Sequence, residues 1–177
     1  MKKLLILSAI SAVAVGFLAS CSSKVSTALT TDSTATMLAK NKATALASEY
    51  AMAKKDADGA YKDCTADFVD YGNGEGKVMK NLDSLKASFK DFVAAFPDLK
   101  MDDVKAYADS NSVVVTAVWS GTFTKEFMKI APTKKMYKAP DADIFTFNKD
   151  GKITSHRSIQ SEATYFAQLG ITPPKKK

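Results

Sequence analysis

The sequence is poor in the residues that metal clusters and disulfide frameworks require. It contains two Cys and one His among 177 residues, and a single Arg. One His cannot form the His clusters of common metal sites, and two Cys cannot hold a small disulfide scaffold together. With 46% apolar and 25% charged residues, the composition is that of an ordinary globular protein, and the length suits one domain.

The formal charge of +6 does not indicate a basic surface, because it comes from the two ends of the chain. Six of the 25 basic residues lie at positions 2, 3, 24 and 175–177, and one of the 19 acidic residues is Asp32. The remaining 19 basic and 18 acidic residues leave the body of the chain at +1. Nucleic acids are recognised through a basic face, so no nucleic-acid partner is predicted.

The first 21 residues have the pattern of an export signal. Two lysines, Lys2 and Lys3, precede an apolar run from Leu4 to Ala19, which is shorter than the roughly 20 apolar residues that span a bilayer. The run ends in Leu18-Ala19-Ser20-Cys21, which resembles the lipobox of bacterial lipoproteins. The resemblance implies cleavage after residue 20, lipidation of Cys21 and a periplasmic or outer-membrane place in the cell envelope. An uncleaved anchor or an ordinary leader is the alternative.

The segment that follows the lipobox is expected to be a tether. Residues 21–36 are rich in Ser, Thr and Ala without an apolar period, which favours a flexible connection between the membrane and the domain. If Cys21 is lipidated, Cys64 has no partner, so no intrachain disulfide is predicted. Nothing around Cys64 would activate a thiol, so we interpret it as a small buried apolar residue.

From residue 37 onward, helical patterns come first and strand patterns later. Helices are predicted over 37–55, 56–64 and 82–96, the last capped by Asn81 and stopped by Pro97. A strand is expected over 67–71, between the second and third of these helices, and further strands over 99–108, 113–124, 135–147 and 152–161, followed by a short helix through Leu169. Asn148 to Gly151 predicts a hairpin turn between the last two strands. This order indicates an α+β domain with helices on one face of an antiparallel sheet.

Seven strings, in this order, resemble the SnoaL-like polyketide cyclase family. They are Ala66-Asp67-Phe68-Val69-Asp70-Tyr71-Gly72, Phe96-Pro97-Asp98-Leu99, Trp119-Ser120-Gly121-Thr122-Phe123, Ala131-Pro132-Thr133, Asp143-Ile144-Phe145-Thr146-Phe147, Asp150-Gly151-Lys152-Ile153 and Gln168-Leu169-Gly170. The resemblance implies a nuclear transport factor 2-like cone over 37–171, in which a curved sheet wraps a long helix, followed by a basic tail at 172–177. It also implies a small, mostly apolar ligand inside the cone, no metal or cofactor, and a homodimer through the outer face of the sheet.

The residues that serve catalysis in that family do not match this chain. Where members commonly have His, it has Tyr71 and Phe123. Where they have Trp and the carboxylate base of the cyclases, it places Arg157 and Ser161. Neither of these two can remove a proton next to a carbonyl group unaided. The family's reaction therefore does not transfer directly, and Asp70 and Asp143 are the weak candidates for a relocated base.

Strand alternation suggests which residues face the cone. If the last strand presents Arg157 and Ser161 to the cone, His156 falls on the outer face as a surface or dimer-contact residue. Arg157 would then either recognise a ligand carboxylate or pair with Asp143 or Asp70. The aromatic residues expected to line the cone with Arg157 and Ser161 are Tyr50, Tyr71, Trp119 and Phe123.

Two functions follow from these observations. The first is a lipid-anchored binding module that holds a small hydrophobic or amphiphilic ligand without turnover. The second is a cofactor-independent cyclase, isomerase or hydrolase whose base is Asp70 or Asp143. A cavity-facing carboxyl group with a raised pKa would favour the enzyme.

Overall fold

The structure is a computed structural model that describes residues 22–74 and 78–172. Residues from Thr34 onward form one compact unit, separate from the segment that ends at Ser33. The predicted leader and its Cys21 lie outside the described residues, as does most of the predicted tail. Among the described residues, no helix has both the length and the apolarity needed to cross a bilayer.

The first helix, α1, runs over Ser22–Ala53, so it begins earlier than the pattern predicted. Residues 22–36, expected to be a tether without regular structure, are helical. This stretch contains neither Gly nor Pro, and extending an existing helix costs far less than starting one. The helical conformation of 37–53 can therefore propagate backward through Ser, Thr and Ala.

Three shorter helices follow, and side chains cap each of them. In α2 (Ala57–Tyr61) the cap is Asp56, and in α3 (Leu82–Ala95) Asn81 accepts a hydrogen bond from the Ser84 amide at 2.8 Å. The last helix, α4 (Glu162–Leu169), begins at the side chain of Ser161 and ends at Gly170, whose φ of 66° is left-handed. The predicted cap at Asn81 and the predicted helix end after Leu169 are confirmed, whereas α2 is shorter than the helix predicted over 56–64, and the caps at Asp56 and Ser161 were not predicted.

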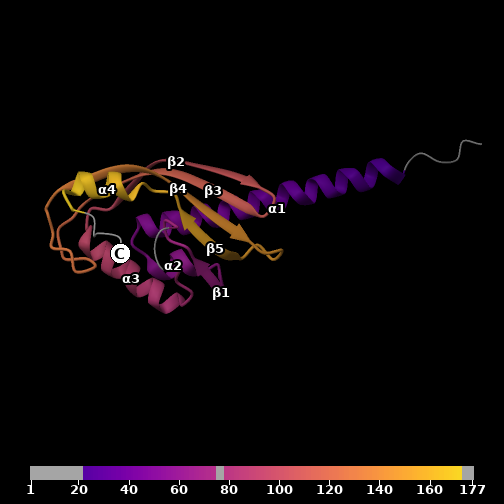
Figure 1. The fold of residues 1–177 in the computed structure, drawn as a ribbon. Coiled ribbons are helices and arrows are strands. Elements are labelled where there is room, and N and C mark those ends of the chain that lie inside the picture. The colour runs from indigo at the N-terminus through magenta and orange to yellow at the C-terminus, as the bar shows by residue number, and fades with distance from the viewer. Residues whose placement is uncertain (1–21, 75–77, 173–177) are drawn as a thin grey trace, which may run out of the picture. The chain divides into compact units, whose positions relative to one another are not determined.

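Five strands form one sheet in the order β1-β5-β4-β3-β2. Their bounds are β1 Cys64–Asp70, β2 Lys100–Asp109, β3 Ser112–Thr122, β4 Met136–Phe147 and β5 Ile153–Ser158. Neighbours pair antiparallel except β1 and β5, which are parallel, so the sheet is mixed rather than wholly antiparallel. Figure 1 shows the long strands β2, β3 and β4 curving over α2 and α3. The predicted α+β class is confirmed.

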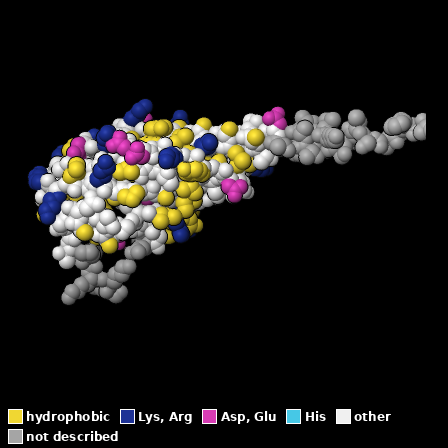
Figure 2. All heavy atoms as spheres, turned by 90° about the horizontal axis from the view of Figure 1, so that it is seen from above, with side chains coloured by type: hydrophobic (Ala, Val, Ile, Leu, Met, Phe, Trp, Pro, Cys, Tyr) yellow, Lys and Arg dark blue, Asp and Glu magenta, His cyan; other side chains and the backbone are white. Residues whose placement is uncertain are grey.

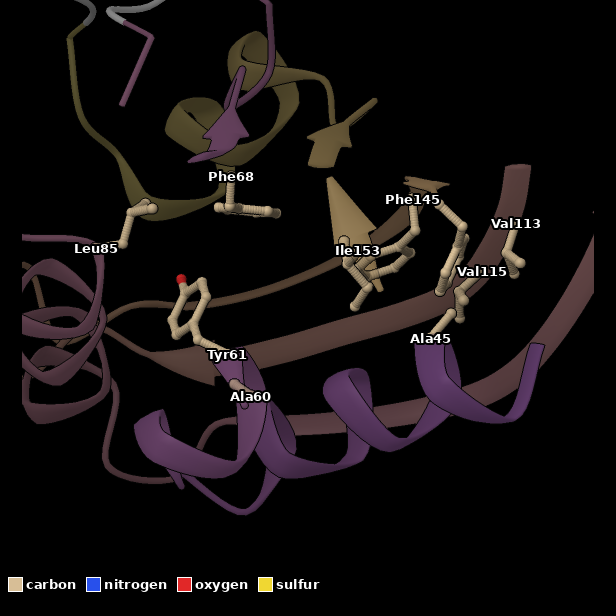
Figure 3. Packing of buried hydrophobic residues seen from close by; sticks show 10 residues of the cluster. Ala45, Ala60, Tyr61, Phe68, Leu85, Val113, Val115, Phe145 and Ile153 are labelled. Carbon is tan, nitrogen blue, oxygen red and sulfur yellow. The ribbon is translucent and has the colours of Figure 1, made fainter. Parts of the chain in front are cut away.

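A core of apolar side chains joins the helices to the concave face of the sheet. Figure 3 shows Ala45 of α1 near Val115, Phe145 and Ile153 of the sheet, and Tyr61 of α2 near Phe68 of β1 and Leu85 of α3. A second cluster is aromatic and centres on Phe96, which is 1% exposed. Its ring lies 4.9 to 6.2 Å from four others, those of Phe92, Phe123, Tyr137 and Tyr165.

The surface of the domain mixes charges of both signs. On the face in Figure 2, basic and acidic side chains are scattered around apolar side chains, which gather in a patch near the middle of the view. Cys64, on β1, is half-buried against the first core cluster and forms no disulfide. Burial, followed by the charges of Asp63 and Asp70, raises the pKa of its thiol to about 12, which fits the predicted unreactive apolar role.

A β-bulge in β5 determines which side chains face the helices. Thr146 of β4 pairs with Ser155, but the next residue, Phe147, pairs with Ile153, which leaves Thr154 as the extra residue. The Thr154 hydroxyl donates to the Thr146 carbonyl at 3.1 Å. A bulge shifts the alternation of a strand by one residue. Ile153 and His156 therefore lie on the same face, although three positions separate them.

Candidate functional site

A cavity of about 990 Å³ lies between the concave face of the sheet, α1, α3 and α4. Its wall is mostly apolar and aromatic, with Phe89, Phe92, Trp119, Phe123, Tyr137, Tyr165 and Phe166 among the lining residues. Its polar lining includes Glu49, Asp70, Asp141, Asp143, His156 and Ser158. Apolar pockets with a few converging polar groups are the usual form of small-molecule sites.

Two acidic residues interrupt an otherwise apolar face of β4. Tyr137, Ala139 and Phe145 alternate along the strand and are buried. Asp141 and Asp143 continue the same alternation, so their side chains point to the cavity rather than to solvent. Asp143 is only 6% exposed. Buried carboxyl groups are costly unless they are hydrogen-bonded or paired, and both of these have partners on β5.

His156 stands between two carboxylates. Its Nε2 lies 2.9 Å from Oδ1 of Asp143, and its Nδ1 lies 3.4 Å from Oδ1 of Asp70, an ion-pair distance without hydrogen-bond geometry. Burial lowers the pKa of the imidazole, but the hydrogen bond with Asp143, the close contact with Asp70 and the charges of both outweigh it and raise the pKa well above 6.5. His156 is therefore an imidazolium at neutral pH.

The same cation acts on Asp70. Burial raises the pKa of the Asp70 carboxyl, but the interactions with His156 and the Gly72 amide, which donates at 2.7 Å, lower it below its usual value. Asp70 is therefore ionised at neutral pH and forms one side of the carboxylate–imidazolium arrangement.

The pKa of Asp141 is shifted in the opposite direction from that of Asp70. Burial and the charge of Asp143 raise the pKa of its carboxyl to about 6, although hydrogen bonds from Ser158 and from the Ala142 amide act to lower it. The Ser158 hydroxyl donates to this carboxyl, with distances of 2.9 and 3.0 Å to its two oxygens. A carboxyl group that titrates near neutral pH inside a cavity can accept and return a proton.

Glu49 supplies a fourth acidic group from α1. It is 1% exposed, and its Oε1 has no hydrogen-bond partner. Burial, then the charge of Asp143, raises the pKa of its carboxyl well above 4.5. Donor atoms of Glu49, Asp143 and His156 lie within 4.8 Å of one another, a spacing that could admit a cation. The single His excluded a His cluster but not a carboxylate-rich site of this kind.

The structure places four of the predicted site residues on the cavity wall. Asp70, Asp143, Trp119 and Phe123 line it. Tyr50, Tyr71, Arg157 and Ser161 are not among the described residues that line the cavity. The Ser161 side chain instead caps α4. Tyr50 and Tyr71 are 46% and 37% exposed.

The expected orientation of the last strand was wrong. Arg157 is exposed, with its guanidinium 5.3 Å from the centre of the Tyr71 ring, whereas His156 faces the cavity. The prediction carried strict alternation from Ile153 to Ser161, but the bulge at Thr154 shifts the alternation by one residue, and β5 ends at Ser158. Asp70 and Asp143 accordingly pair with His156 and not with Arg157.

Sequence reasoning missed Glu49, Asp141, Ser158 and the inward orientation of His156. A signal existed for Asp141 and Asp143, because both fall in the apolar half of an alternating strand. Glu49 also lies on a buried helix face, together with Asn41, Ala45 and Ser48. Polar residues on an apolar face are the pattern that can locate such groups.

Comparisons with known proteins identify the architecture. The family model described as SnoaL-like polyketide cyclase matches residues 42–169. AclR of Streptomyces galilaeus, whose hydroxylase assignment is provisional, is 26% identical with a TM-score of 0.65, covering 77% of this chain and 99% of its own. A provisionally assigned SnoaL-like polyketide cyclase from Jannaschia sp. CCS1 is 19% identical with a TM-score of 0.69, and the match covers 77% of this chain and 96% of that protein. A phenazine biosynthesis-related protein of Pseudomonas aeruginosa is 19% identical with a TM-score of 0.65, covering 82% and 95%. No curated protein matches the chain by sequence.

Proposed function

We propose that this chain, which belongs to the SnoaL-like polyketide cyclase family, binds a small and mostly apolar carbonyl compound in its cavity. We further propose that it transfers a proton on that compound without a cofactor, as a cyclase, isomerase or hydrolase does. One observation carries the proposal: a carboxyl group whose pKa is near 6 lies on the wall of an apolar cavity beside a buried imidazolium.

Asp141 is the base in this proposal. Removing a proton next to a carbonyl group requires an acceptor whose pKa is close to the working pH, and the raised pKa of Asp141 meets that requirement. The Ser158 hydroxyl, which donates to both carboxyl oxygens, holds the group in one orientation. Asp70 and Asp143, the candidates from the sequence, instead flank His156.

His156 supplies the electrostatic counterpart. Proton removal leaves negative charge on the carbonyl oxygen of the ligand, and a fixed cation in a site of low dielectric constant stabilises such charge. Asp143 and Asp70 keep the imidazole protonated and hold its ring in place. The mostly apolar wall lowers the dielectric constant around the site, which strengthens this interaction.

Binding without turnover, the first function inferred from the sequence, is the second candidate. This candidate is favoured because His156 already has a carboxylate on each side. Buried ion pairs of this kind also occur in proteins where they have no catalytic role. In that case the cavity would hold its ligand, and the acid–base groups would serve only to shape the wall.

Proton transfer can be tested with 4-phenyl-2-butanone in D₂O, followed by mass spectrometry. We expect the protein to accelerate deuterium incorporation next to the carbonyl group, and Asp141→Asn to remove the acceleration. The control is Asp102→Asn, because Asp102 pairs with Lys100 on the surface and is outside the cavity lining. Equal exchange in the wild type and in Asp141→Asn contradicts proton transfer by Asp141, while a ligand-induced rise in melting temperature without exchange supports binding alone.

We also propose that the protein is attached to the bacterial cell envelope through lipid on Cys21. Two or three acyl chains, at about 0.8 kcal/mol per buried CH₂, hold a protein on a bilayer. We expect Cys21→Ser to move the protein to the soluble fraction, and Cys64→Ser to leave it on the membrane. Membrane residence of the Cys21→Ser variant contradicts the lipobox interpretation.

A homodimer through the outer face of the sheet is a further proposal from the family resemblance. Tyr107 of β2 and Met136 of β4 are both 60% exposed on that face. Sedimentation velocity of the wild type and Tyr107→Asp tests the association, which should weaken in the variant. An unchanged monomer in both proteins contradicts it.

A further inference from the structure

Glu49 takes no part in the proposed proton transfer, yet it is the most buried acidic group on the cavity wall. It is 1% exposed, compared with 8% for Asp70 and 6% for Asp143. Its Oε1 has no hydrogen-bond partner. Buried polar atoms in native proteins are nearly always paired, and a carboxyl group in an apolar site is costly without a partner. A donor group on a bound ligand would satisfy this acceptor.

The charges on the cavity wall determine the kind of donor. Five carboxyl groups line the cavity with the imidazole of His156: those of Glu49, Asp70, Asp141 and Asp143, and that of Glu162, which is exposed at the start of α4. Among the described lining residues, Lys129 is the only Lys or Arg, and it is exposed in the 127–131 segment. The His156 imidazolium is already paired with Asp70 and Asp143, so a ligand with negative charge would be repelled by the carboxyl groups, whereas a positive charge would be attracted.

The aromatic part of the wall fits the same kind of ligand. Phe89, Phe92 and Trp119 line the cavity together with the acidic groups. Aromatic faces attract organic cations as well as apolar groups, so they suit a molecule with both. A bare metal ion would use the carboxylates but leave most of the 990 Å³ cavity unfilled.

We infer that the ligand of this cavity is an apolar molecule with a protonated amino group, and that Glu49 accepts a hydrogen bond from that group. This inference deepens the proposed function, since it takes the cavity as the ligand site and names the class of ligand. It replaces the expected recognition of a carboxylate by Arg157, whose guanidinium lies over the exposed Tyr71 ring. An ammonium beside Glu49 and Asp143 satisfies the unpaired oxygen and offsets the excess negative charge.

The inference can be tested with three probes that share one apolar body and differ in charge. They are 3-phenylpropylamine, 3-phenylpropan-1-ol and 3-phenylpropionate, added to the purified full-length protein in detergent at pH 7.5 and followed by thermal shift and calorimetry. We expect the amine to bind about tenfold more tightly than the alcohol, as a charge-assisted hydrogen bond predicts. We expect no shift with the carboxylate.

Variants locate the contact. Glu49→Gln keeps the shape of the side chain but cannot form a carboxylate beside the ammonium, so it should bring the amine down to the affinity of the alcohol while alcohol binding persists. The matched control is Glu162→Gln, because Glu162 also lines the cavity but is exposed at the start of α4. That variant should keep the tenfold preference. The comparison of probes on the wild type stands even if Glu49→Gln proves unstable.

The outcomes separate this inference from the proposed function. Equal binding of amine and alcohol, or tighter binding of the carboxylate, overturns the amine inference but leaves the cavity as a ligand site. Stabilisation by MnCl₂ or ZnCl₂ that Glu49→Gln abolishes also overturns it, because the carboxyl groups would then hold a metal ion. Failure of all three probes overturns it as well, and the deuterium-exchange assay then decides the proposed function independently.

Discussion

Nε2 of His156 lies 2.9 Å from Oδ1 of Asp143, and the two residues come from neighbouring strands of the concave face. His156 is the only histidine in the chain. The protonation of the cavity can therefore be followed by NMR through the one imidazole signal of the protein, which needs no distinction from other histidines.

Asp143→Asn should lower the pKa of His156. The interactions with Asp143 are the first of the contributions that raise this pKa, so the variant retains only the weaker contact with Asp70. NMR titration of the imidazole Cε1 proton measures the pKa directly, and Asp102→Asn is the surface control. An unchanged titration in Asp143→Asn contradicts the pairing.

The pairing also has a consequence for stability. Because the folded-state pKa of His156 is above its unfolded value of about 6.5, the folded state binds the proton more tightly. The stabilisation is complete below pH 6.5 and is lost as the pH rises through the folded-state pKa. Urea unfolding of the wild type should show this loss, and Asp143→Asn should show less of it.

Asp141 should make the protein less stable as the pH rises from about 4 to 6. The unfolded carboxyl releases its proton near 3.8, whereas the folded one retains it to about 6. The folded state therefore binds more protons in this window, and stability falls with rising pH. Asp141→Asn removes the titrating group, so the difference in melting temperature between the variant and the wild type should grow across the window. A constant difference contradicts the raised pKa.

Deletions in β5 test the role of the bulge. Deleting Thr154 alone removes the extra residue and leaves Ile153 and His156 on the same face, so the raised pKa of His156 should persist. Deleting Thr154 and Ser155 together inverts the alternation and should return the pKa towards 6.5 or expose Ile153, at a cost of about 1.5 to 3 kcal/mol. The NMR titration distinguishes these cases. A raised pKa together with an unchanged free energy of unfolding in the double deletion contradicts the bulge as the cause.

Phe96→Ala should strongly destabilise the fold. Phe96 joins the end of α3 to rings of β4 and α4, and it is 1% exposed. Truncating a buried Phe typically costs about 3 to 5 kcal/mol. Urea unfolding measures the change, and Tyr107→Ala is the control, because this exposed side chain should alter stability by no more than about 0.5 kcal/mol. Equal effects of the two substitutions contradict the central position of Phe96.

Local signals predicted most of the elements because each depends on a few neighbouring residues. Asn81 caps α3, and Gly170 ends α4 with a left-handed backbone. In the 148–151 turn, Gly151 has a φ of 76° and donates to the Asn148 carbonyl at 3.0 Å. Each of these contacts joins residues a few positions apart, so the local sequence is sufficient to predict it.

The candidate site was only partly predictable, because its groups meet across long stretches of chain. The alternation of β4 was sufficient to turn Asp143 inward, and the family strings were sufficient to anticipate a cone with Trp119 and Phe123 on its wall. The inward orientation of His156 depends on a bulge that forms only when β5 pairs with β4. Nothing adjacent to His156 in the sequence indicates that bulge.

The amino-acid sequence by itself determined the α+β class, the order of the helices and strands, and an apolar interior with aromatic walls, since hydrophobic periodicity and capping act over short distances. Tertiary structure alone decided that Glu49 of α1, Asp141 of β4 and His156 of β5 share one cavity wall. The physical reason is that the pKa of each group depends on burial and on charges brought close by strand pairing and helix packing, and these distances do not exist in the extended chain.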